Sequence, residues 1–353
     1  MHDNYPNYSV LTPYLIPTSL QGRKVVNLGD GFILRAIERL IGRFSIQNIH
    51  SPRIALSGEI IQSLKQNRVV ILAGANQLND RYTVWPGLTA ERIHLDNLRL
   101  IPFAIGLHGE KGYTDKLSDA TRSVLLALHE KIEYSSWRCP RTVAYLNQQL
   151  PELSGQLIMT GCPVVYDTPL LEGRSFYSGT RKIAVTVTER HDFWARETRV
   201  IDFVAKHFPR SQRFLVLHQN YSPPQRFEHF RHRWGIGSEA SLNEYQKLRK
   251  YAVCRGFRVI CPKDADDCIS FYRHMDFHVG SRLHAHLLFL SRAKRSMLVP
   301  VDDRALGMAE FLGFPLYAPD ELAEGLEFDF NIVRERATQG YEEMKRFLKS
   351  LRA

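Results

Sequence analysis

The chain has 353 residues, of which 44% are hydrophobic and 24% charged, and this length and composition are typical of a soluble globular protein of two domains. Its formal net charge of +10 indicates an anionic partner. The basic residues are scattered among the predicted helices and strands and form no long basic tail, so an acidic substrate or an anionic membrane surface is favoured over nucleic acid. The 5 cysteines form no CxxC pair, which argues against a disulfide framework. No apolar run of about 18 residues occurs, which argues against a membrane span. The first residues lack a signal-peptide pattern, so we predict a cytoplasmic protein.

Apolar strands alternate with helical patterns along the first half of the chain. We predict strands at 25–29, 69–74, 100–106, 131–136 and 157–165. Helical patterns cover 31–42 and 141–150. Strands that are apolar throughout and separated by helices indicate a parallel sheet covered on both faces. The polar, glycine-containing stretch 170–182 is the predicted linker.

The second half repeats this alternation. We predict strands at 182–188, 213–219, 257–262, 276–280 and 296–301. Helices are predicted over 197–208, 242–256, 282–293 and 331–351, and 220–238 is irregular and contains prolines. The fold class is therefore α/β, with two Rossmann-like, doubly wound domains facing a central cleft, because ligands bind beyond the carboxyl ends of parallel strands. We place the domains at 1–175 and 176–325, and we expect the helix within 326–353 to pack back on the first domain.

Several loops of the first domain follow predicted strands and so lie where a ligand is expected. Asn27 and Asp30 follow the first strand. Asp30 can cap the next helix or contact a ligand hydroxyl, and we favour capping. Gly74 ends the second strand, where a single glycine is a weak phosphate-loop signal, and His108 follows the third as a polar loop residue or a ligand.

Three later strand ends carry charged or nucleophilic side chains. Arg138 lies at a strand-to-helix junction before Pro140, a residue typical of the first helical turn, and it either faces the ligand or is a surface charge. Cys162 can be read as a nucleophile, but a small buried thiol is the better interpretation because no nearby His marks an activated Cys. The segment 302–304, Asp-Asp-Arg, has no partner carboxylate at a fixed offset, so we predict no required metal.

The most informative stretch is 276–293, where a strand runs into Gly280 and Ser281 and a helix then opens with Arg282 and His284. The first N–H groups of a helix suit a phosphate or a carboxylate. Arg offers a planar fork for either anion, and His exchanges a proton near neutral pH. The alternative is that Ser281 is a helix cap, Arg282 a surface charge and His284 a polar neighbour of a leucine stripe.

These loops in chain order resemble those of the polysaccharide pyruvyl transferase family. The segments are NLGDG, the glycine-ended second strand, SSWRCPRTVAYL, TGCP, VGSRLHAHLLFL and VPVDDRALGMAEFLGFP, within residues 25–317. The resemblance implies a GT-B-like arrangement of the two domains, with the acceptor on the first and the donor, phosphoenolpyruvate, on the second. A hydroxyl pair of a glycan sugar would receive pyruvate as a ketal, in exopolysaccharide or cell-surface glycan biosynthesis.

The family's motifs assign roles to individual residues of this chain. Arg138, Arg282 and Arg304 fall on donor-binding positions, and His284 falls on the histidine of the Arg-Leu-His motif. Two departures stand out. Similar proteins commonly have Lys where this chain has Arg304, and the loop after the second strand is usually richer in glycine than the single Gly74 here.

The chemistry fits these residue types independently of the family. Arginines can hold both the carboxylate and the phosphate of phosphoenolpyruvate, and His284 is the predicted general acid toward its methylene carbon. Phosphoenolpyruvate is then a co-substrate, and no cofactor is required. The predicted acceptor or cleft residues are Asn27, Asp30, Gly74 and His108.

Two other functions use the same pattern. One is a GT-B glycosyltransferase in which Arg282 and His284 hold the diphosphate of a nucleotide sugar, and the other is a non-catalytic protein that binds an acidic glycan. For the transferase we expect a cytoplasmic protein in peripheral contact with the inner membrane face, acting on a sugar acceptor such as a lipid-linked oligosaccharide. The sequence leaves the acceptor sugar and the oligomeric state open.

Overall fold

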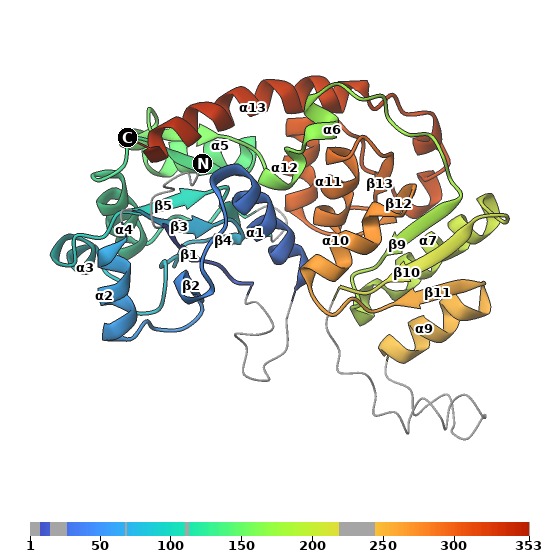
Figure 1. Ribbon diagram of the computed structural model, residues 1–353, viewed down its shortest axis with the longest axis horizontal. Coiled ribbons are helices and arrows are strands. Elements are labelled where there is room, and N and C mark those ends of the chain that lie inside the picture. The colour runs from blue at the N-terminus through green and yellow to red at the C-terminus, as the bar shows by residue number, and fades with distance from the viewer. Residues whose placement is uncertain (1–7, 15–26, 68, 110–112, 219–243, 353) are drawn as a thin grey trace.

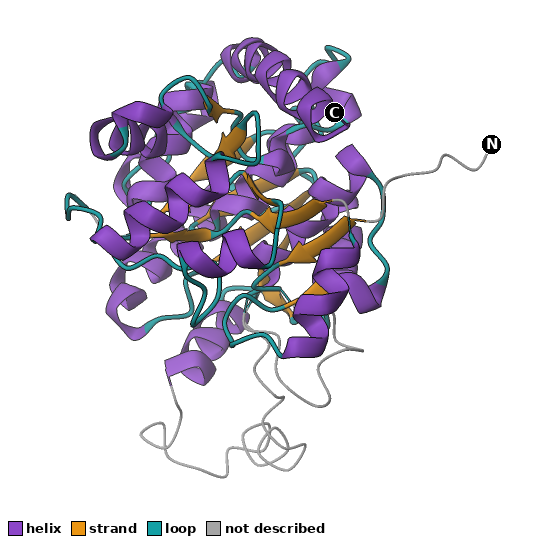
Figure 2. Cartoon of the chain, turned by 90° about the vertical axis from the view of Figure 1, so that its left-hand side faces the viewer, coloured by secondary structure: helices purple, strands orange, loops and turns teal. Residues whose placement is uncertain are grey.

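Two parallel sheets form the two halves of the molecule, shown at left and right in Figure 1. The computed structural model describes residues 8–14, 27–67, 69–109, 113–218 and 244–352. Helices cover both faces of the sheets (Figure 2). The strands within each sheet are parallel, as apolar strands joined by helical crossovers require.

The first half contains the following elements. Its strands are β1 Tyr8–Leu11, β2 Ile49–His50, β3 Val69–Ala73, β4 Asn76–Leu78, β5 Leu100–Phe103, β6 Gly106–Leu107, β7 Ser135–Trp137 and β8 Leu157–Met159. Its helices are α1 Leu28–Ile41, α2 Gly58–Gln66, α3 Ala90–Leu95, α4 Asp119–His129, α5 Pro140–Gln149 and α6 Thr168–Leu171.

The second half is built in the same way. Its strands are β9 Lys182–Thr186, β10 Gln212–Val216, β11 Phe257–Ile260, β12 Phe277–Gly280 and β13 Ser296–Leu298. Its helices are α7 Trp194–His207, α9 Glu244–Cys254, α10 Ala265–Arg273, α11 Leu283–Ser291, α12 Asp303–Leu312 and the final α13 Asn331–Arg352.

The strand orders identify both sheets as doubly wound. The first sheet has the order β2-β1-β3-β5 and the second β11-β10-β9-β12-β13. The winding reverses between β1 and β3 in one sheet and between β9 and β12 in the other, and ligands bind at such reversal points. The predicted α/β class with two Rossmann-like sheets is thus confirmed.

Two predicted strands are corrected. Of the strand expected at 25–29, residues 25 and 26 lie outside the described residues, whereas Leu28 and Gly29 already belong to α1. Asn27 is the N-cap of that helix, and the sheet begins instead with the four-residue β1. The strand expected at 157–165 ends at Met159, because the Pro163 segment forms a 3-10 turn. The irregular segment 220–238 lies outside the described residues.

One of the three hydrophobic clusters in the described part of the chain is shared by the two halves. Helix α1 contacts both α10 and α11 of the second half, and its Phe32, Ile33 and Ile37 are buried in a cluster that contains residues of both sheets. The Arg35 guanidinium of α1 also binds the Asp266 carboxylate of α10, with Nε–Oδ1 and Nη2–Oδ2 distances of 2.8 and 2.6 Å. This packing fixes the amino end of α1 against the second sheet.

The final helix α13 runs across the molecule (Figure 1). It contacts α12 of the second half and also α6, β7 and β8 of the first. Its residues Val333, Met344 and Phe347 are buried. Among the described residues, no helix is both long and apolar enough to cross a bilayer.

Candidate functional site

Three pockets adjoin one another where the carboxyl ends of the two sheets face each other. Arg304 at the start of α12 lines all three. We name them by their walls. The histidine pocket (about 50 Å³) includes Asn27, Gly29, Thr188, Arg190, His218, Ser281, Arg282, His284 and Arg304. The aromatic pocket (about 410 Å³) includes Gly106, His108, Tyr113, Arg138, Tyr145 and Arg304. The amide pocket (about 470 Å³) includes Asn27, Asp30, Arg53, Asn76, Gln77, Asn79, Thr83, His108 and Arg304.

His284 lies in the first turn of α11, directly against the amino end of α1. A Cβ atom on Gly29 would lie 2.7 Å from His284 Nδ1, so only glycine allows α1 to approach the imidazole this closely. The Nε2 atom of His284 is buried and has no hydrogen-bond partner within the described part of the chain. A buried polar atom without a partner is rare, and His284 is also one of the residues that line the histidine pocket.

The electrostatic surroundings keep His284 neutral. Burial, followed by the positive charges of three neighbouring arginines, holds the pKa of His284 well below its usual range. An anion bound among those arginines would reduce that effect and raise the pKa again. Burial, the larger cause, would remain, so a bound anion offsets only the contribution of the arginines.

Arg282 is the N-cap residue of α11, and Ser281 precedes the cap. The Arg282 guanidinium donates from Nε to the Val187 carbonyl at 2.7 Å and from Nη2 to the Thr188 carbonyl at 2.9 Å and Glu189 Oε1 at 2.8 Å. These contacts tie the amino end of α11 to the loop that follows β9. Arg282 thus has a structural task in addition to lining the histidine pocket.

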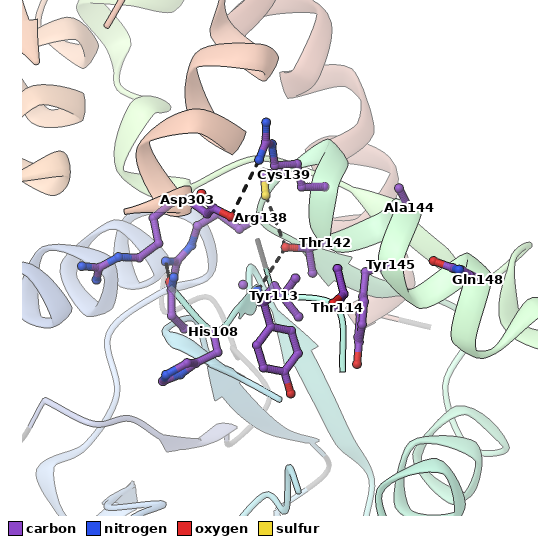
Figure 3. Close-up of a pocket in the computed structure, with 15 residues that line it drawn as sticks. His108, Tyr113, Thr114, Arg138, Cys139, Thr142, Ala144, Tyr145, Gln148 and Asp303 are labelled. Atoms are coloured by element: carbon purple, nitrogen blue, oxygen red, sulfur yellow. Dashed lines mark hydrogen bonds and ion pairs between the residues drawn. The ribbon is translucent and has the colours of Figure 1, made fainter. Parts of the chain in front are cut away.

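Arg138 follows β7 and lies in the wall of the aromatic pocket (Figure 3). Its Nη1 donates to Asn76 Oδ1, while Nε and Nη2 are buried and have no hydrogen-bond partner among the described residues. Only 2% of the residue is exposed, and burial lowers its pKa below the usual arginine value. A buried guanidinium with two vacant donor atoms is suited to a carboxylate or a phosphate.

Arg304 is held by the cap of its own helix. Asp302 accepts a hydrogen bond from the Arg304 backbone N–H at 3.1 Å and one from Nε at 2.8 Å. Its second carboxylate oxygen also contacts Nη2. This pairing fixes the guanidinium at the junction of the three pockets, although it also means that an anionic ligand shares Arg304 with a carboxylate.

The aromatic pocket has a ladder of rings along one side. The centroids of His108 and Tyr113 are 6.4 Å apart, and those of Tyr113 and Tyr145 are 5.9 Å apart, both in edge-to-face geometry. Figure 3 shows Tyr113 between the other two. The predicted cleft residue His108 lies at the point where this pocket meets the amide pocket.

Asp30 lines the amide pocket and is only 9% exposed. The capping role that we favoured for it belongs to Asn27, whose Oδ1 accepts the Gly29 N–H at 3.0 Å. Asp30 is instead in the first turn of α1, and its Oδ2 is 4.0 Å from Arg53 Nη2. The Asn27 side chain also donates a hydrogen bond to this carboxylate, and both residues line the pocket.

Two other residues predicted from the sequence have different surroundings. Gly74 packs against backbone, since a Cβ there would lie 2.3 Å from the Ala104 carbonyl oxygen. Cys162 is fully buried, and burial raises the pKa of its thiol, which agrees with the interpretation as a small buried thiol. Within the described residues, no group of three or more His, Cys, Asp or Glu side chains has the arrangement of a metal site.

Sequence reasoning missed His218 and Asn76. Asn76 follows β3 and accepts the Arg138 hydrogen bond, and His218 follows β10 and lines the histidine pocket. His218 Nε2 is 2.6 Å from the Tyr272 hydroxyl, and burial is the main reason that its pKa lies well below the usual range. Asn76 stands just beyond the strand predicted at 69–74, so the rule that singled out Gly74 and Arg138 would also have found it. His218 was hidden because the predicted strand 213–219 includes it, whereas β10 ends at Val216.

Comparison with known proteins gives one match to a family. The family model described as polysaccharide pyruvyl transferase matches residues 27–303 of the chain, a range that begins at Asn27 and ends just after Asp302. No curated protein matches the sequence.

Solved structures show more distant likenesses. An accessory secretory protein 1, 2 and 3 structure from Streptococcus pneumoniae is 12% identical, with a TM-score of 0.44 over 79% of this chain, which spans 50% of that one. UDP-N-acetylglucosamine 2-epimerase from Rickettsia bellii is 7% identical, with a TM-score of 0.48 over 98% of this chain and 95% of the other. MurG from Acinetobacter baumannii is 10% identical, with a TM-score of 0.45 over 99% of this chain and 100% of the other. Likenesses this distant say nothing about activity.

Proposed function

This chain belongs to the polysaccharide pyruvyl transferase family, and we propose that it transfers the pyruvyl group of phosphoenolpyruvate to a pair of hydroxyls on a glycan sugar. The product is a pyruvate ketal, which adds a carboxylate to the glycan. The observation that carries this proposal is the buried Arg138, whose two vacant donor atoms lie in the same cleft as Arg304 and the unpartnered His284 Nε2.

Phosphoenolpyruvate matches this arrangement because it bears two anionic groups close together. Arg138 offers Nε and Nη2 on one edge, which is the geometry of a bidentate contact with a carboxylate or a phosphate. Arg304, at the junction of the pockets, supplies the second positive charge. Holding both ends of the donor fixes its reactive carbon in the cleft, and such positioning contributes a large part of enzymatic rate enhancement.

His284 supplies the proton that activates the donor. Protonation of the methylene carbon creates an electron-poor C2, which a sugar hydroxyl attacks before phosphate leaves and a second hydroxyl closes the ketal. The negative charges of the donor favour the protonated form of His284, because they offset the neighbouring arginines that add to the effect of burial on its pKa. General acid catalysis of this kind typically contributes on the order of a hundred to ten-thousand-fold.

The proposed reaction uses phosphoenolpyruvate as co-substrate and requires no metal or cofactor. We propose that it takes place in the cytoplasm, at the inner face of the membrane, on a lipid-linked glycan. The net charge of +10 would then concentrate the protein weakly on acidic headgroups.

Calorimetric titration of the purified protein with phosphoenolpyruvate, UDP-glucose and UDP-N-acetylglucosamine tests the donor. We expect phosphoenolpyruvate to bind. We also expect the isotherm for phosphoenolpyruvate to be the same with and without the nucleotide sugars. Release of inorganic phosphate from phosphoenolpyruvate in the presence of glycan fractions then tests the transfer. Binding of nucleotide sugars without any binding of phosphoenolpyruvate would replace this proposal with a glycosyltransferase.

A further inference from the structure

Asp30 and His284 lie on different sides of the amino end of α1. Gly29 faces His284 in the histidine pocket, and the next residue, Asp30, faces the amide pocket. Asn27 caps the helix and lines both pockets. The first turn of one helix therefore separates two buried groups that can each carry a proton.

The amide pocket has the lining of a sugar site. Asn76, Gln77, Asn79 and Thr83 offer side-chain amides and a hydroxyl, which pair with sugar hydroxyls as both donors and acceptors. Its volume of about 470 Å³ is that of a small-molecule site. Within this lining the described structure has one carboxylate, that of Asp30.

We propose that Asp30 is the general base that takes the proton from the attacking hydroxyl of the acceptor, which lies in the amide pocket. This inference rests on the proposed function and assigns the second proton carrier that the reaction needs. His284 donates to the methylene carbon from the donor side, and Asp30 accepts from the hydroxyl on the acceptor side.

The proton and electron balance requires two carriers. As the first C2–O bond forms, the hydroxyl proton moves to Asp30, and the π electrons of phosphoenolpyruvate take the proton of His284 at C3. The C2–O bond to phosphate then breaks with its electron pair on phosphate, which receives the proton held by Asp30. The second hydroxyl forms the second C2–O bond and returns a proton to His284. The products are one ketal and one hydrogen phosphate, and both side chains recover their starting states.

The surroundings of Asp30 suit this role. Burial raises the pKa of its carboxyl, and the nearby positive charges of Arg53, Arg138 and Arg304 oppose that shift. The carboxylate is thus more basic than an exposed aspartate would be, which suits a group that accepts a proton. Because it is only 9% exposed, bulk water has little access to the proton that it accepts.

The test compares Asp30→Asn and Asp30→Glu with the wild-type protein and with Asp266→Asn. Asp266 is the matched control because its loss breaks the ion pair to Arg35 of the same helix without touching the pockets. Phosphoenolpyruvate affinity is measured by calorimetry, and unfolding temperature by thermal denaturation. The rate is measured as phosphate release, with lipid-linked and nucleotide-linked glycan fractions from a strain deleted for this gene as acceptors.

We expect Asp30→Asn to bind phosphoenolpyruvate at least as tightly as wild type, because a negative charge near Arg138 and Arg304 is removed, and to lose about 100-fold or more in rate. Asp30→Glu should keep a measurable rate, and Asp266→Asn should stay within about twofold of wild type. Asparagine still hydrogen-bonds a hydroxyl, so an Asp30→Asn rate above about a tenth of wild type would overturn the proposal. A lowered donor affinity or a large fall in unfolding temperature would instead assign Asp30 a structural role. If wild type neither binds phosphoenolpyruvate nor releases phosphate, the proposed function itself fails.

Discussion

Replacement of Arg138 by Met should stabilise the free protein while it weakens the donor complex. Met has nearly the volume of Arg, so the change removes the buried charge and leaves the packing almost intact. The two buried nitrogen atoms without partners each cost about 1–3 kcal/mol in the folded state, and the hydrogen bond to Asn76 that is lost contributes about 1 kcal/mol. The expected net gain is about 2 kcal/mol, within the range of about 1–4 kcal/mol for buried ion pairs replaced by well-packed apolar groups.

Binding should change in the opposite direction. Two charge-assisted hydrogen bonds of about 1.5 kcal/mol each correspond to roughly a 100-fold loss of phosphoenolpyruvate affinity. At a donor concentration of about 100 times the wild-type dissociation constant, wild type gains about 2.7 kcal/mol of stability, and Arg138→Met gains only about 0.4 kcal/mol. The two proteins should therefore differ by about 2 kcal/mol without donor and be nearly equal with it.

Denaturant unfolding with and without phosphoenolpyruvate measures both effects, and calorimetry gives the affinities directly. Arg213→Met is the matched control, because Arg213 Nε is also buried without a partner while the residue lines none of the three pockets. That variant should keep wild-type donor affinity. The reasoning is refuted if Arg138→Met lowers the stability of the free protein by more than about 1 kcal/mol and still binds the donor as wild type does.

Three further predictions concern protonation, the Arg282 contacts and metal dependence. The proposed acid step requires a protonated His284 in the donor complex, whereas burial and the neighbouring arginines depress its pKa in the free protein. Donor binding near pH 7.5 should therefore take up protons from solution. Calorimetry in PIPES and in Tris should show this uptake in wild type and none in His284→Gln, and equal enthalpies in both buffers for wild type would contradict the acid role. Arg282→Lys should lower the unfolding temperature as well as the rate, because Lys cannot replace the guanidinium that donates to the carbonyls of both Val187 and Thr188. An unchanged unfolding temperature would show that these contacts are dispensable. Dialysis against EDTA should leave phosphate release unchanged, and a loss restored by a divalent cation would refute the metal-free reaction.

A fourth prediction in this group is that the protein sediments with anionic vesicles at low salt and stays in the supernatant at about physiological ionic strength or with neutral vesicles, because surface charge contacts are screened within roughly 10 Å. Equal recovery in the supernatant under every condition would leave a soluble acceptor.

The strands were predictable where the sequence carries a local signal. Val69–Ala73 and Phe277–Gly280 are short apolar runs with turn residues after them, and the structure has strands there. The run Tyr8–Leu11 is only four residues long and follows a proline, so it carried too little signal, although its strand lies at the centre of the first sheet.

The site was predictable only in part. The end of a predicted strand indicates where a residue lies in the fold, but it does not indicate which side chains that residue contacts. Asn27 and Asp30 are both good capping residues by type, and the choice between them depends on the backbone at the start of α1. Arg138 is buried against Asn76 of β4 and Gly106 of β6, which are distant in sequence, so no local pattern records its two vacant donor atoms. His218 gave no signal of its own, since its partner Tyr272 is 54 positions away.

The contacts of Arg282 give the Arg-Leu-His triplet a structural role in addition to its place in the histidine pocket. Its guanidinium binds three oxygen atoms of residues 187–189, so it joins the helix that carries His284 to the loop that carries Thr188. An N-terminal helix turn that only bound an anion would tolerate Lys, whereas this bridge needs the planar fork of Arg. The spacing of the triplet then follows from geometry: Arg282 caps α11 and faces the β9 loop, and His284, in the first turn, faces Gly29 of the other half. One short motif thereby fixes the second half of the cleft and places the proposed acid at its boundary with the first.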